Sequence, residues 1–436
     1  SGIALGSEWI SDQARQRHTH IVGATGSGKT VAIEHLLFAD LRRGYGALII
    51  DPKGDREFYD RVATYCNLVG RRDDLLLLSA TYPNESVSWN PCALGNVSEL
   101  QSKFFNSSIY NEPHYAKACE AALLRAFNQL TKEYPSGFTI NHLVMVLEEM
   151  AESSKDKTID GLFFDLFNLA NGEWREILMC GSANAKQEVS LLNVTQNNKI
   201  LFVQLPTESK AVQSARIGRL LTQEIMTISG MRKTNPEIRS GIPFSIFIDE
   251  FDAFATESIA TFINKGRSSD FMIHMAHQTL SDLNRISPDF KGQIMGNCNV
   301  RFIFRQDDPD DAETWSRVFG TKTTFKHTAQ TEGGVQTGAG SMRETREFRI
   351  TPDKIKELQV GRCIFYVKTD RRLKELKIKK PIQLKVSKVE QSTKVQVRSG
   401  EIRPPKPKAI VFEEVQHESK PASATFEDLK IKLTIN

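Results

Sequence analysis

The residues best suited to chemistry in this chain are eight consecutive ones with the sequence GATGSGKT. The spacing G-x-x-x-x-G-K-T is that of a phosphate-binding loop, in which glycines let the backbone turn its N–H groups toward phosphate oxygens. In such a loop the Lys29 ammonium would reach the β- and γ-phosphates of ATP, and the Thr30 hydroxyl would bind Mg²⁺. We therefore predict that ATP is bound by Gly23, Ala24, Thr25, Gly26, Ser27, Gly28, Lys29 and Thr30.

The sequence on either side of this loop decides between a nucleotide site and a glycine-rich turn without a ligand. The apolar run His20-Ile21-Val22 precedes the loop, and a stretch of helical character, Val31 to Leu37, follows it. A phosphate-binding loop needs this order of strand, loop and helix, because the N-terminal end of the helix carries partial positive charge. The flanking sequence therefore favours the nucleotide site.

A second stretch ends an apolar run in two acids, Asp249 and Glu250. In a phosphate-loop enzyme the first acid, Asp249, would hold Mg²⁺, usually through water. The second acid, Glu250, would orient and activate the attacking water. Adjacent acids alone are common on protein surfaces. An apolar strand that ends in Asp-Glu, in a chain with a phosphate-binding loop, predicts that ATP is hydrolysed as well as bound.

Two further polar residues lie on either side of the apolar run 271–276, Arg267 before it and Gln278 after it. Gln278, in the stretch AHQT, can hydrogen-bond the γ-phosphate or the attacking water, and a polar strand end is the alternative. Arg267, in the stretch KGR, could act as an arginine finger on a neighbouring subunit's γ-phosphate. A solvated basic loop is an equally good interpretation of Arg267. Arg301 and Arg305 are lesser candidates for the same role.

The stretch DPKGD at positions 51–55 follows another apolar run. Ligands of open α/β sheets bind at the carboxyl ends of the strands, so Asp51 and Lys53 could lie near the nucleotide. A surface turn explains these residues equally well.

Apolar runs ending in polar residues predict an α/β fold with a mostly parallel sheet, since strands buried on both faces read as continuous apolar runs. Such runs recur near positions 47–50, 75–78, 200–205, 244–248, 271–276, 300–304 and 363–367.

Between about 96 and 195, apolar residues recur instead at the helical period of three and four, and strand-like runs are absent. We predict a nucleotide-binding domain in two parts, 1–95 and 196–380, an inserted all-α domain at 96–195, and a basic linker and tail at 381–436. The polar, glycine-rich stretch near 321–346 is typical of a loop or hairpin.

The totals fit a globular protein of 436 residues with 25% charged residues and a formal net charge of +4. This charge neither demands nor excludes nucleic acid. The six cysteines contain no C-x-x-C pair, which argues against a zinc ribbon or a disulfide framework. No run approaches the ~20 apolar residues that span a bilayer. Because the chain opens Ser-Gly without an initiator methionine, we expect a trimmed chain that lacks an upstream segment with a membrane anchor.

In their order along the chain, these motifs resemble those of TraG/TraD-like type IV coupling proteins, relatives of the HerA/FtsK DNA-pumping ATPases. The resemblance covers most of residues 15–370 and rests on GATGSGKT, DPKGD, LFVQLP, SIFIDE, KGR and AHQT. Many ATPases share the loop and the acid pair. The combination with DPKGD, the Gln278 strand and the helical insertion is more specific.

The resemblance implies a RecA-like motor, assembled as a homohexamer, that couples ATP hydrolysis to passage of DNA through a central channel. Its partners would be DNA, relaxase and other relaxosome proteins, and components of a type IV secretion channel during bacterial conjugation. It would work at the cytoplasmic face of the bacterial inner membrane, and an isolated fragment could be monomeric. The inserted domain would recognise DNA or its processing proteins. A protein-secretion or assembly ATPase of the same superfamily is the alternative, because the motifs cannot separate the two.

A channel for DNA requires basic side chains that follow the phosphates without reading bases. The candidates are Lys265, Arg267, Lys322, Lys326 and Arg343, and ordinary surface charge is the alternative for each.

Overall fold

The computed structural model of the chain describes residues 1–379, apart from positions 55, 111, 154–156, 179, 181–186, 288 and 333–334. For positions 157, 209, 210, 265, 267 and 327–341 it describes the backbone alone. The chain divides into a compact unit, Ser1–Ser387, and a second unit, Lys388–Asn436, which lies outside the described residues. The linker and tail predicted for 381–436 lie outside them as well.

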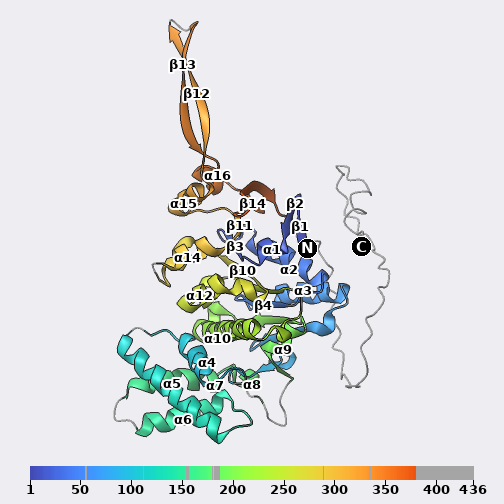
Figure 1. Cartoon of the computed structure of the whole chain (residues 1–436), viewed down its shortest axis with the longest axis vertical. Helices are drawn as coiled ribbons and strands as arrows, with labels where there is room; N and C mark the ends of the chain where they lie inside the picture. Colours follow the sequence, from blue (N-terminus) through green and yellow to red (C-terminus); the bar gives the residue numbers. More distant parts are fainter. Residues whose placement is uncertain are drawn as a thin grey trace. The chain divides into compact units, whose positions relative to one another are not determined.

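A nine-stranded sheet forms the centre of the first unit (Figure 1), with the strand order β15-β14-β11-β3-β10-β9-β4-β8-β5. Neighbouring strands from β11 to β5 are parallel, whereas β14 and β15 pair antiparallel at one edge. The bounds of these strands are β3 Thr19–Val22, β4 Ala47–Asp51, β5 Leu75–Ser79, β8 Ile200–Gln204, β9 Phe244–Ile248, β10 Phe271–His277, β11 Val300–Ile303, β14 Arg362–Val367 and β15 Arg372–Lys377. The α/β class with a mostly parallel sheet is therefore confirmed.

The parallel register brings the carboxyl ends of the central strands to one edge of the sheet. Val22 at the end of β3 pairs with His277 of β10, and Ile248 at the end of β9 pairs with Met275. Residues that follow these strands therefore meet at the edge where α/β sheets bind their ligands.

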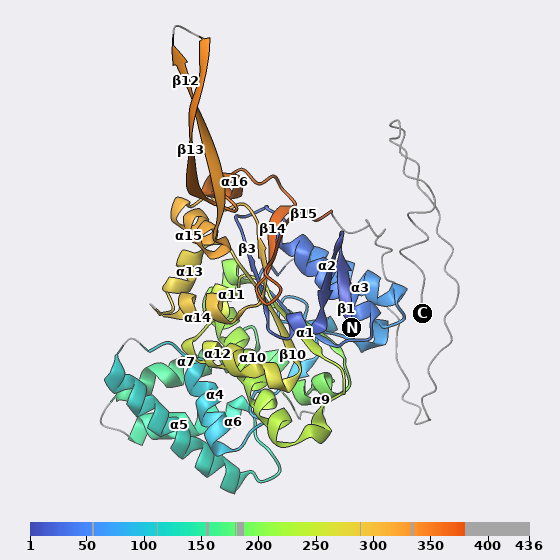
Figure 2. The same ribbon diagram turned by 45° about the horizontal axis from the view of Figure 1, so that its top comes forward.

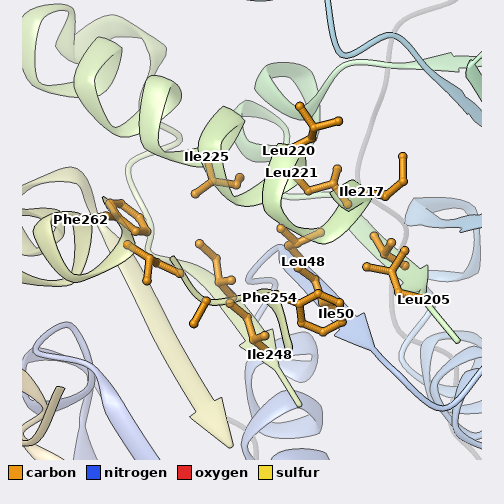
Figure 3. Close-up of a cluster of buried hydrophobic side chains, with 14 of the residues drawn as sticks. Leu48, Ile50, Leu205, Ile217, Leu220, Leu221, Ile225, Ile248, Phe254 and Phe262 are labelled. Atoms are coloured by element: carbon orange, nitrogen blue, oxygen red, sulfur yellow. The ribbon is translucent and has the colours of Figure 1, made fainter. Parts of the chain in front are cut away.

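The strands are apolar on both faces because helices cover both faces. In β4, Leu48 and Ile50 belong to one buried cluster, whereas Ala47 and Ile49 belong to another, as the alternation of side chains along a strand requires. Figure 3 shows part of the first cluster, where side chains of the sheet meet Ile217, Leu221 and Ile225 of the long helix α10 (Thr207–Thr234). This double burial explains the continuous apolar runs in the sequence.

Helices α2 (Lys29–Arg42) and α3 (Arg56–Leu68) supply side chains to the second cluster. On the other face, α10 is joined by α12 (Glu257–Lys265) and α14 (Phe290–Asn297). Other helices of the part of the chain around the sheet are α1 Asp12–Arg15, α9 Leu191–Gln196, α11 Phe251–Phe254, α13 Leu280–Asn284, α15 Pro309–Phe319 and α16 Pro352–Lys356. Within the described part of the chain, none of the helices has the length and apolar character that a bilayer crossing needs.

A group of helices follows β5 in the chain and lies beside α10 (Figure 1). It contains α4 Val97–Asn106, α5 Pro113–Glu133, α6 Ile140–Ser153, α7 Asp160–Asn171 and α8 Arg175–Leu178. The prediction that strands are absent from 96–195 is wrong at one place. Strand β7 (Glu188–Val189) pairs in parallel with β6 (Ser88–Trp89), and two residues are too few to leave a periodic pattern.

A buried ion pair ties α4 to α10. The Lys103 ammonium lies 2.9 Å from the Glu224 carboxylate, and both side chains are almost completely buried. Lys103 also donates to the carbonyls of Pro91 and Leu94, at 3.0 and 2.8 Å, and Trp89 Nε1 donates to the second Glu224 oxygen at 3.3 Å. Because these bonds satisfy both charges, the pair can be buried without an unpaired ion.

The stretch predicted as a loop or hairpin is a long hairpin of β12 (Thr321–Glu332) and β13 (Val335–Phe348). It extends beyond α16 and away from the sheet (Figure 2). Near its base, Lys326 pairs with Glu347 at 2.9 Å. A smaller hairpin of β1 (Gly2–Leu5) and β2 (Glu8–Ser11) begins the chain.

Candidate nucleotide site

The phosphate-binding loop connects β3 to α2 at the carboxyl edge of the sheet. Gly26 and Gly28 have φ of 72° and 118°, a region that side-chain-bearing residues rarely adopt. A Cβ atom on Gly23 would lie 2.5 Å from the Cβ atom of Phe304, so that position has no room for a side chain. The three glycines of the motif are thus required by the backbone conformation and by the close approach of β11.

Two segments from late in the chain hold this loop from outside. The Ala24 N–H donates to the Arg305 carbonyl at 2.8 Å, just after β11. The Gly361 N–H donates to the Ser27 carbonyl at 2.8 Å, just before β14. The loop is therefore fixed by the same antiparallel edge that extends the parallel sheet.

The Lys29 ammonium lies inside the loop and donates to the Gly23 and Ala24 carbonyls at 2.6 and 3.2 Å. Its side chain is buried, and burial lowers the pKa of the ammonium, while the nearby Asp249 carboxylate acts in the opposite direction. A buried cation at the centre of a ring of backbone groups is well placed to meet an anion, such as the β- and γ-phosphates.

The Thr30 hydroxyl lies between two charged groups. It donates to an Asp249 carboxylate oxygen at 3.3 Å, and the Lys53 ammonium donates to it at 3.3 Å. Among the described residues no group of three or more His, Cys, Asp or Glu side chains could hold a metal ion. The hydroxyl and the carboxylate are hard oxygen ligands, which fits Mg²⁺ bound by few protein groups together with nucleotide phosphates.

Glu250 is the N-cap residue of α11 and has a left-handed backbone conformation, with φ of 44°. Its own N–H donates to Asp249 Oδ1 at 3.1 Å, and the Thr207 hydroxyl donates to its carboxylate at 3.5 Å. Burial raises the pKa of the Glu250 carboxyl, and the neighbouring Asp249 and Asp252 carboxylates raise it further. A carboxylate with a raised pKa beside a phosphate-binding loop is suited to accept a proton from water.

Gln278 follows β10 and reaches the loop itself, since the Thr25 hydroxyl donates to its amide oxygen at 3.0 Å. The preceding residue, His277, is buried and stacks on His20 of β3, with ring centroids 4.8 Å apart. Gln278 is thus an exposed side chain on a rigid strand end beside the phosphate-binding loop.

Two family models match this chain. The type IV secretion-system coupling protein DNA-binding domain matches residues 3–160, and the TraM recognition site of TraD and TraG matches residues 243–360. The chain belongs to the type IV coupling proteins. The family predicted from the motifs is therefore confirmed.

Type 4 coupling protein DotL of Legionella pneumophila is 24% identical to this coupling protein in an alignment 394 positions long that covers 72% of this chain. The match spans only 50% of the DotL length. The two family models and this match agree on the family. They do not show that this chain has the activity of full-length DotL, since half of DotL lies outside the match.

Solved structures show the same fold. The bacterial conjugative coupling protein TrwBdeltaN70 superposes with a TM-score of 0.68 at 16% identity, covering 87% of this chain and 88% of that one. TrwB in complex with the ATP analogue ADPNP superposes with a TM-score of 0.67 at 16% identity, covering 87% of this chain and 89% of TrwB. VirB4 of Thermoanaerobacter pseudethanolicus superposes with a TM-score of 0.58 at 14% identity, covering 88% of this chain and 97% of VirB4.

The structure places the three candidate arginine fingers in different environments in this coupling protein. The prediction that Arg301 is an arginine finger is wrong, because its side chain is buried against Trp315 and Tyr366 and donates to the Met295 carbonyl. Arg305 pairs with Asp307 at 2.9 Å. The side chains of Arg267 and Lys265 lie outside the described residues, and the Arg267 backbone belongs to a short 3-10 turn, Gly266–Ser269.

The structure brings Lys53 to the phosphate-binding loop, so the surface-turn interpretation of DPKGD does not hold for this side chain. Asp51 is buried at the end of β4. Sequence reasoning missed Thr207 and Gly361. Thr207 could have been found from its place three residues after β8, since the parallel strands of an α/β sheet end at the edge where ligands bind.

Proposed function

We propose that this coupling protein binds ATP with Mg²⁺, hydrolyses the ATP, and uses the free energy to move DNA toward a type IV secretion channel. The observation that supports the proposal best is the meeting of Lys29, Thr30 and Asp249 at one sheet edge, with Glu250 beside them. Nucleotide-hydrolysing enzymes with a phosphate-binding loop use a carboxylate to hold Mg²⁺ and a second polar group to position the attacking water, and this arrangement provides both.

Each residue has a proposed role. The loop Gly23 to Thr30 holds the phosphates, with Lys29 as the cation on the β- and γ-phosphates. Thr30 and Asp249 hold Mg²⁺, which supplies charge neutralisation for the transferred phosphoryl group when it is bound. Glu250 accepts the proton of the attacking water, and Gln278 contacts the γ-phosphate or that water. Arg267 acts from a neighbouring subunit of a homohexamer.

The domain division belongs to the same proposal. Residues 1–95 and 196–380 form the RecA-like nucleotide-binding domain, and 96–195 form an inserted helical domain for DNA or relaxosome proteins. The chain works at the cytoplasmic face of the bacterial inner membrane. Lys322 and Arg343 on the hairpin are exposed in this structure and are candidates for DNA contacts.

The decisive experiment is the rate of phosphate release with and without DNA, at several salt concentrations. We expect DNA to stimulate the rate several-fold at low salt, and the stimulation to fade as salt rises, because phosphate contacts release counterions. The Glu250→Gln variant is the control for contaminating ATPase. Equal turnover with and without DNA at every salt concentration would contradict the DNA motor.

An ATPase that moves polypeptide is the second candidate. The mild net charge of +4 and the pairing of Lys326 with Glu347 favour it, because a DNA channel needs unpaired cations. Filter binding with single- and double-stranded DNA discriminates the two, since a polypeptide motor should retain neither.

The trans role of Arg267 is tested by the ATPase rate per subunit against protein concentration. A ring with catalysis across subunit interfaces should show a steep rise, and Arg267→Ala should abolish that rise. A rate independent of concentration would leave Arg267 as a surface residue.

A further inference from the structure

A cavity of about 840 Å³ lies between the helical group and α10. Its walls come from the residues after α4, from α7, from the first turns of α10 and from Ala253 of α11. Figure 2 shows α10 beside the helical group. The volume is that of a pocket for a drug-sized ligand or a short peptide segment.

Two arginines of α10 line this cavity, one helical turn apart. Arg216 is 6% exposed, and only its Nη1 has a partner among the described residues, the Asp165 carboxylate at 3.1 Å. Its Nε and Nη2 atoms and the Nε atom of Arg219 are buried without a hydrogen-bond partner in the described part of the chain. The Arg219 Nη1 atom donates to the Ser107 carbonyl at 3.3 Å, so each guanidinium is only partly satisfied. Buried N–H groups of a cation without acceptors are costly, so these groups point to an anion that would complete their bonds.

The burial of the two guanidinium groups also disfavours their charged forms, as expected for cations that lack full hydrogen bonding. It lowers the pKa of Arg216 and of Arg219, and the Arg216 charge lowers the Arg219 pKa further. Asp165 offsets one of the two charges, and its side chain is 59% exposed to solvent. The cavity therefore keeps an excess of positive charge at its base.

The rim of the cavity is apolar and open. Val212 is 79% exposed, Ile109 is 70% exposed and Phe167 is 41% exposed, and all three line it. Exposed apolar patches beside a concave surface mark protein interaction sites more often than free surface. Asn168 and Gln213 also line the cavity, where the Gln213 amide donates to the Asn168 main-chain carbonyl at 3.3 Å.

From this arrangement we propose that the cavity binds a peptide segment of a partner protein that carries a carboxylate among apolar side chains. The carboxylate completes the bonds of Arg216 and Arg219, and the apolar side chains cover Ile109, Phe167 and Val212. A nucleic-acid backbone fits less well. Phosphate contacts are made by exposed cations on wet surfaces, whereas Arg216 is buried and Arg219 half-buried beside an apolar rim, next to the Asp165 carboxylate.

Binding of a peptide in this cavity does not depend on the proposed motor function. One residue connects the two sites, because Thr207 lines the cavity and its hydroxyl donates to the Glu250 carboxylate. A segment bound here would therefore lie against the start of α10, next to the proposed catalytic base.

The test is fluorescence anisotropy with the full chain, without ATP or DNA, so its result is separate from the motor activity. The probes are a fluorescein-labelled dodecapeptide with the core Leu-Glu-Phe-Leu, the same peptide with Gln in place of Glu, and an oligodeoxythymidylate. We expect the Glu peptide to bind about tenfold more tightly than the Gln peptide, because a bond to a charged group is lost. The oligonucleotide should not displace it.

The double variant Arg216→Gln, Arg219→Gln should weaken the Glu peptide about tenfold, and Arg317→Gln, a surface arginine of α15 that is 71% exposed, should not. If the double variant fails to fold, Val212→Asp on the exposed rim replaces it, and its new charge should repel the Glu peptide more than the Gln peptide. Equal binding of the two peptides, unchanged binding by both variants, or displacement by the oligonucleotide would overturn the proposal.

Discussion

Thr25 of the phosphate-binding loop donates a hydrogen bond of 3.0 Å to Gln278 at the end of β10. The two residues lie 253 positions apart in the sequence and meet because β10 pairs in parallel with β3. The loop that would hold the phosphates is thus connected directly to a second strand of the sheet. A γ-phosphate that competes for either side chain would change this contact, which makes Gln278 a suitable sensor of hydrolysis.

The first prediction concerns Gln278. Gln278→Ala should lower kcat for ATP about tenfold, because an interaction with the γ-phosphate or the attacking water is lost in the transition state. ATP affinity, measured by calorimetry, should change less than about threefold, since the rest of the loop remains. Gln293→Ala, an exposed residue of α14, is the matched control. Wild-type kcat in the Gln278 variant would contradict the role.

The second prediction concerns Lys29. Lys29→Ala should weaken ATP binding about 100-fold and abolish turnover, because the buried cation at the loop centre is removed. The thermal unfolding midpoint should fall only slightly, because the hydrogen bonds of Lys29 go to the neutral Gly23 and Ala24 carbonyls and the Asp249 carboxylate keeps its bonds to Thr30 and to the Glu250 N–H. ATP binding at wild-type strength would show that the loop does not hold the phosphates through this residue.

How much of the site could be predicted depends on how local its signal is. The loop and the Asp249–Glu250 pair were predictable because each directly follows a strand with a plain apolar pattern. Lys103 and Glu224 were not, because both are charged and lie 121 positions apart, and nothing in either helix marks them as buried partners. The start of α10 at Thr207 leaves no capping signal in the sequence, because its N-cap residue, Pro206, forms no side-chain cap bond.

The third prediction concerns Glu250. Glu250→Gln should keep ATP affinity and lower turnover about 100- to 1,000-fold, because the amide cannot accept the proton of the attacking water. In the wild type, the raised pKa of Glu250 means that the rate should already fall at a pH above the ordinary carboxylate range as the solution is acidified.

The Asp252 carboxylate is one cause of the raised pKa of Glu250, so replacing Asp252 tests separately whether Glu250 is the base. In Asp252→Asn the acid limb of the kcat/KM profile should move to lower pH, since one negative charge near Glu250 is gone. A limb that stays in place in Asp252→Asn, or turnover that survives in Glu250→Gln, would mean that another group is the base.

The fourth prediction concerns the buried pair that joins α4 to α10. Lys103→Met should lower the free energy of unfolding by about 3–5 kcal/mol, because Glu224 is left buried without its counterion. The double variant Lys103→Met, Glu224→Leu should recover much of this loss, since it leaves no unpaired charge. Urea denaturation measures all three proteins. A double variant less stable than the single one would show that the polar bonds to Trp89, Pro91 and Leu94 matter more than the charge.

The fifth prediction concerns the stacked histidines beneath the nucleotide site. Burial lowers the pKa of His277 to about 4, and it lowers that of His20 well below 6.5. The unfolded chain therefore binds these protons more readily than the folded one. The stability that depends on neutral histidines is complete above pH 6.5 and is lost as the pH falls from 6.5 toward 4, by about 3 kcal/mol for a group with the His277 shift.

His20→Phe keeps a ring against His277 and Trp315 but removes one titrating group. The variant can be less stable at neutral pH, because His277 loses the ring nitrogen that it bonds. Its unfolding free energy should nevertheless fall less steeply between pH 6.5 and 4 than that of the wild type, since fewer protons are taken up on unfolding. Urea denaturation at pH 7.5, 6, 5 and 4.5 measures the two slopes. Parallel slopes would mean that the carboxylates of the chain, and not this histidine pair, govern its acid sensitivity.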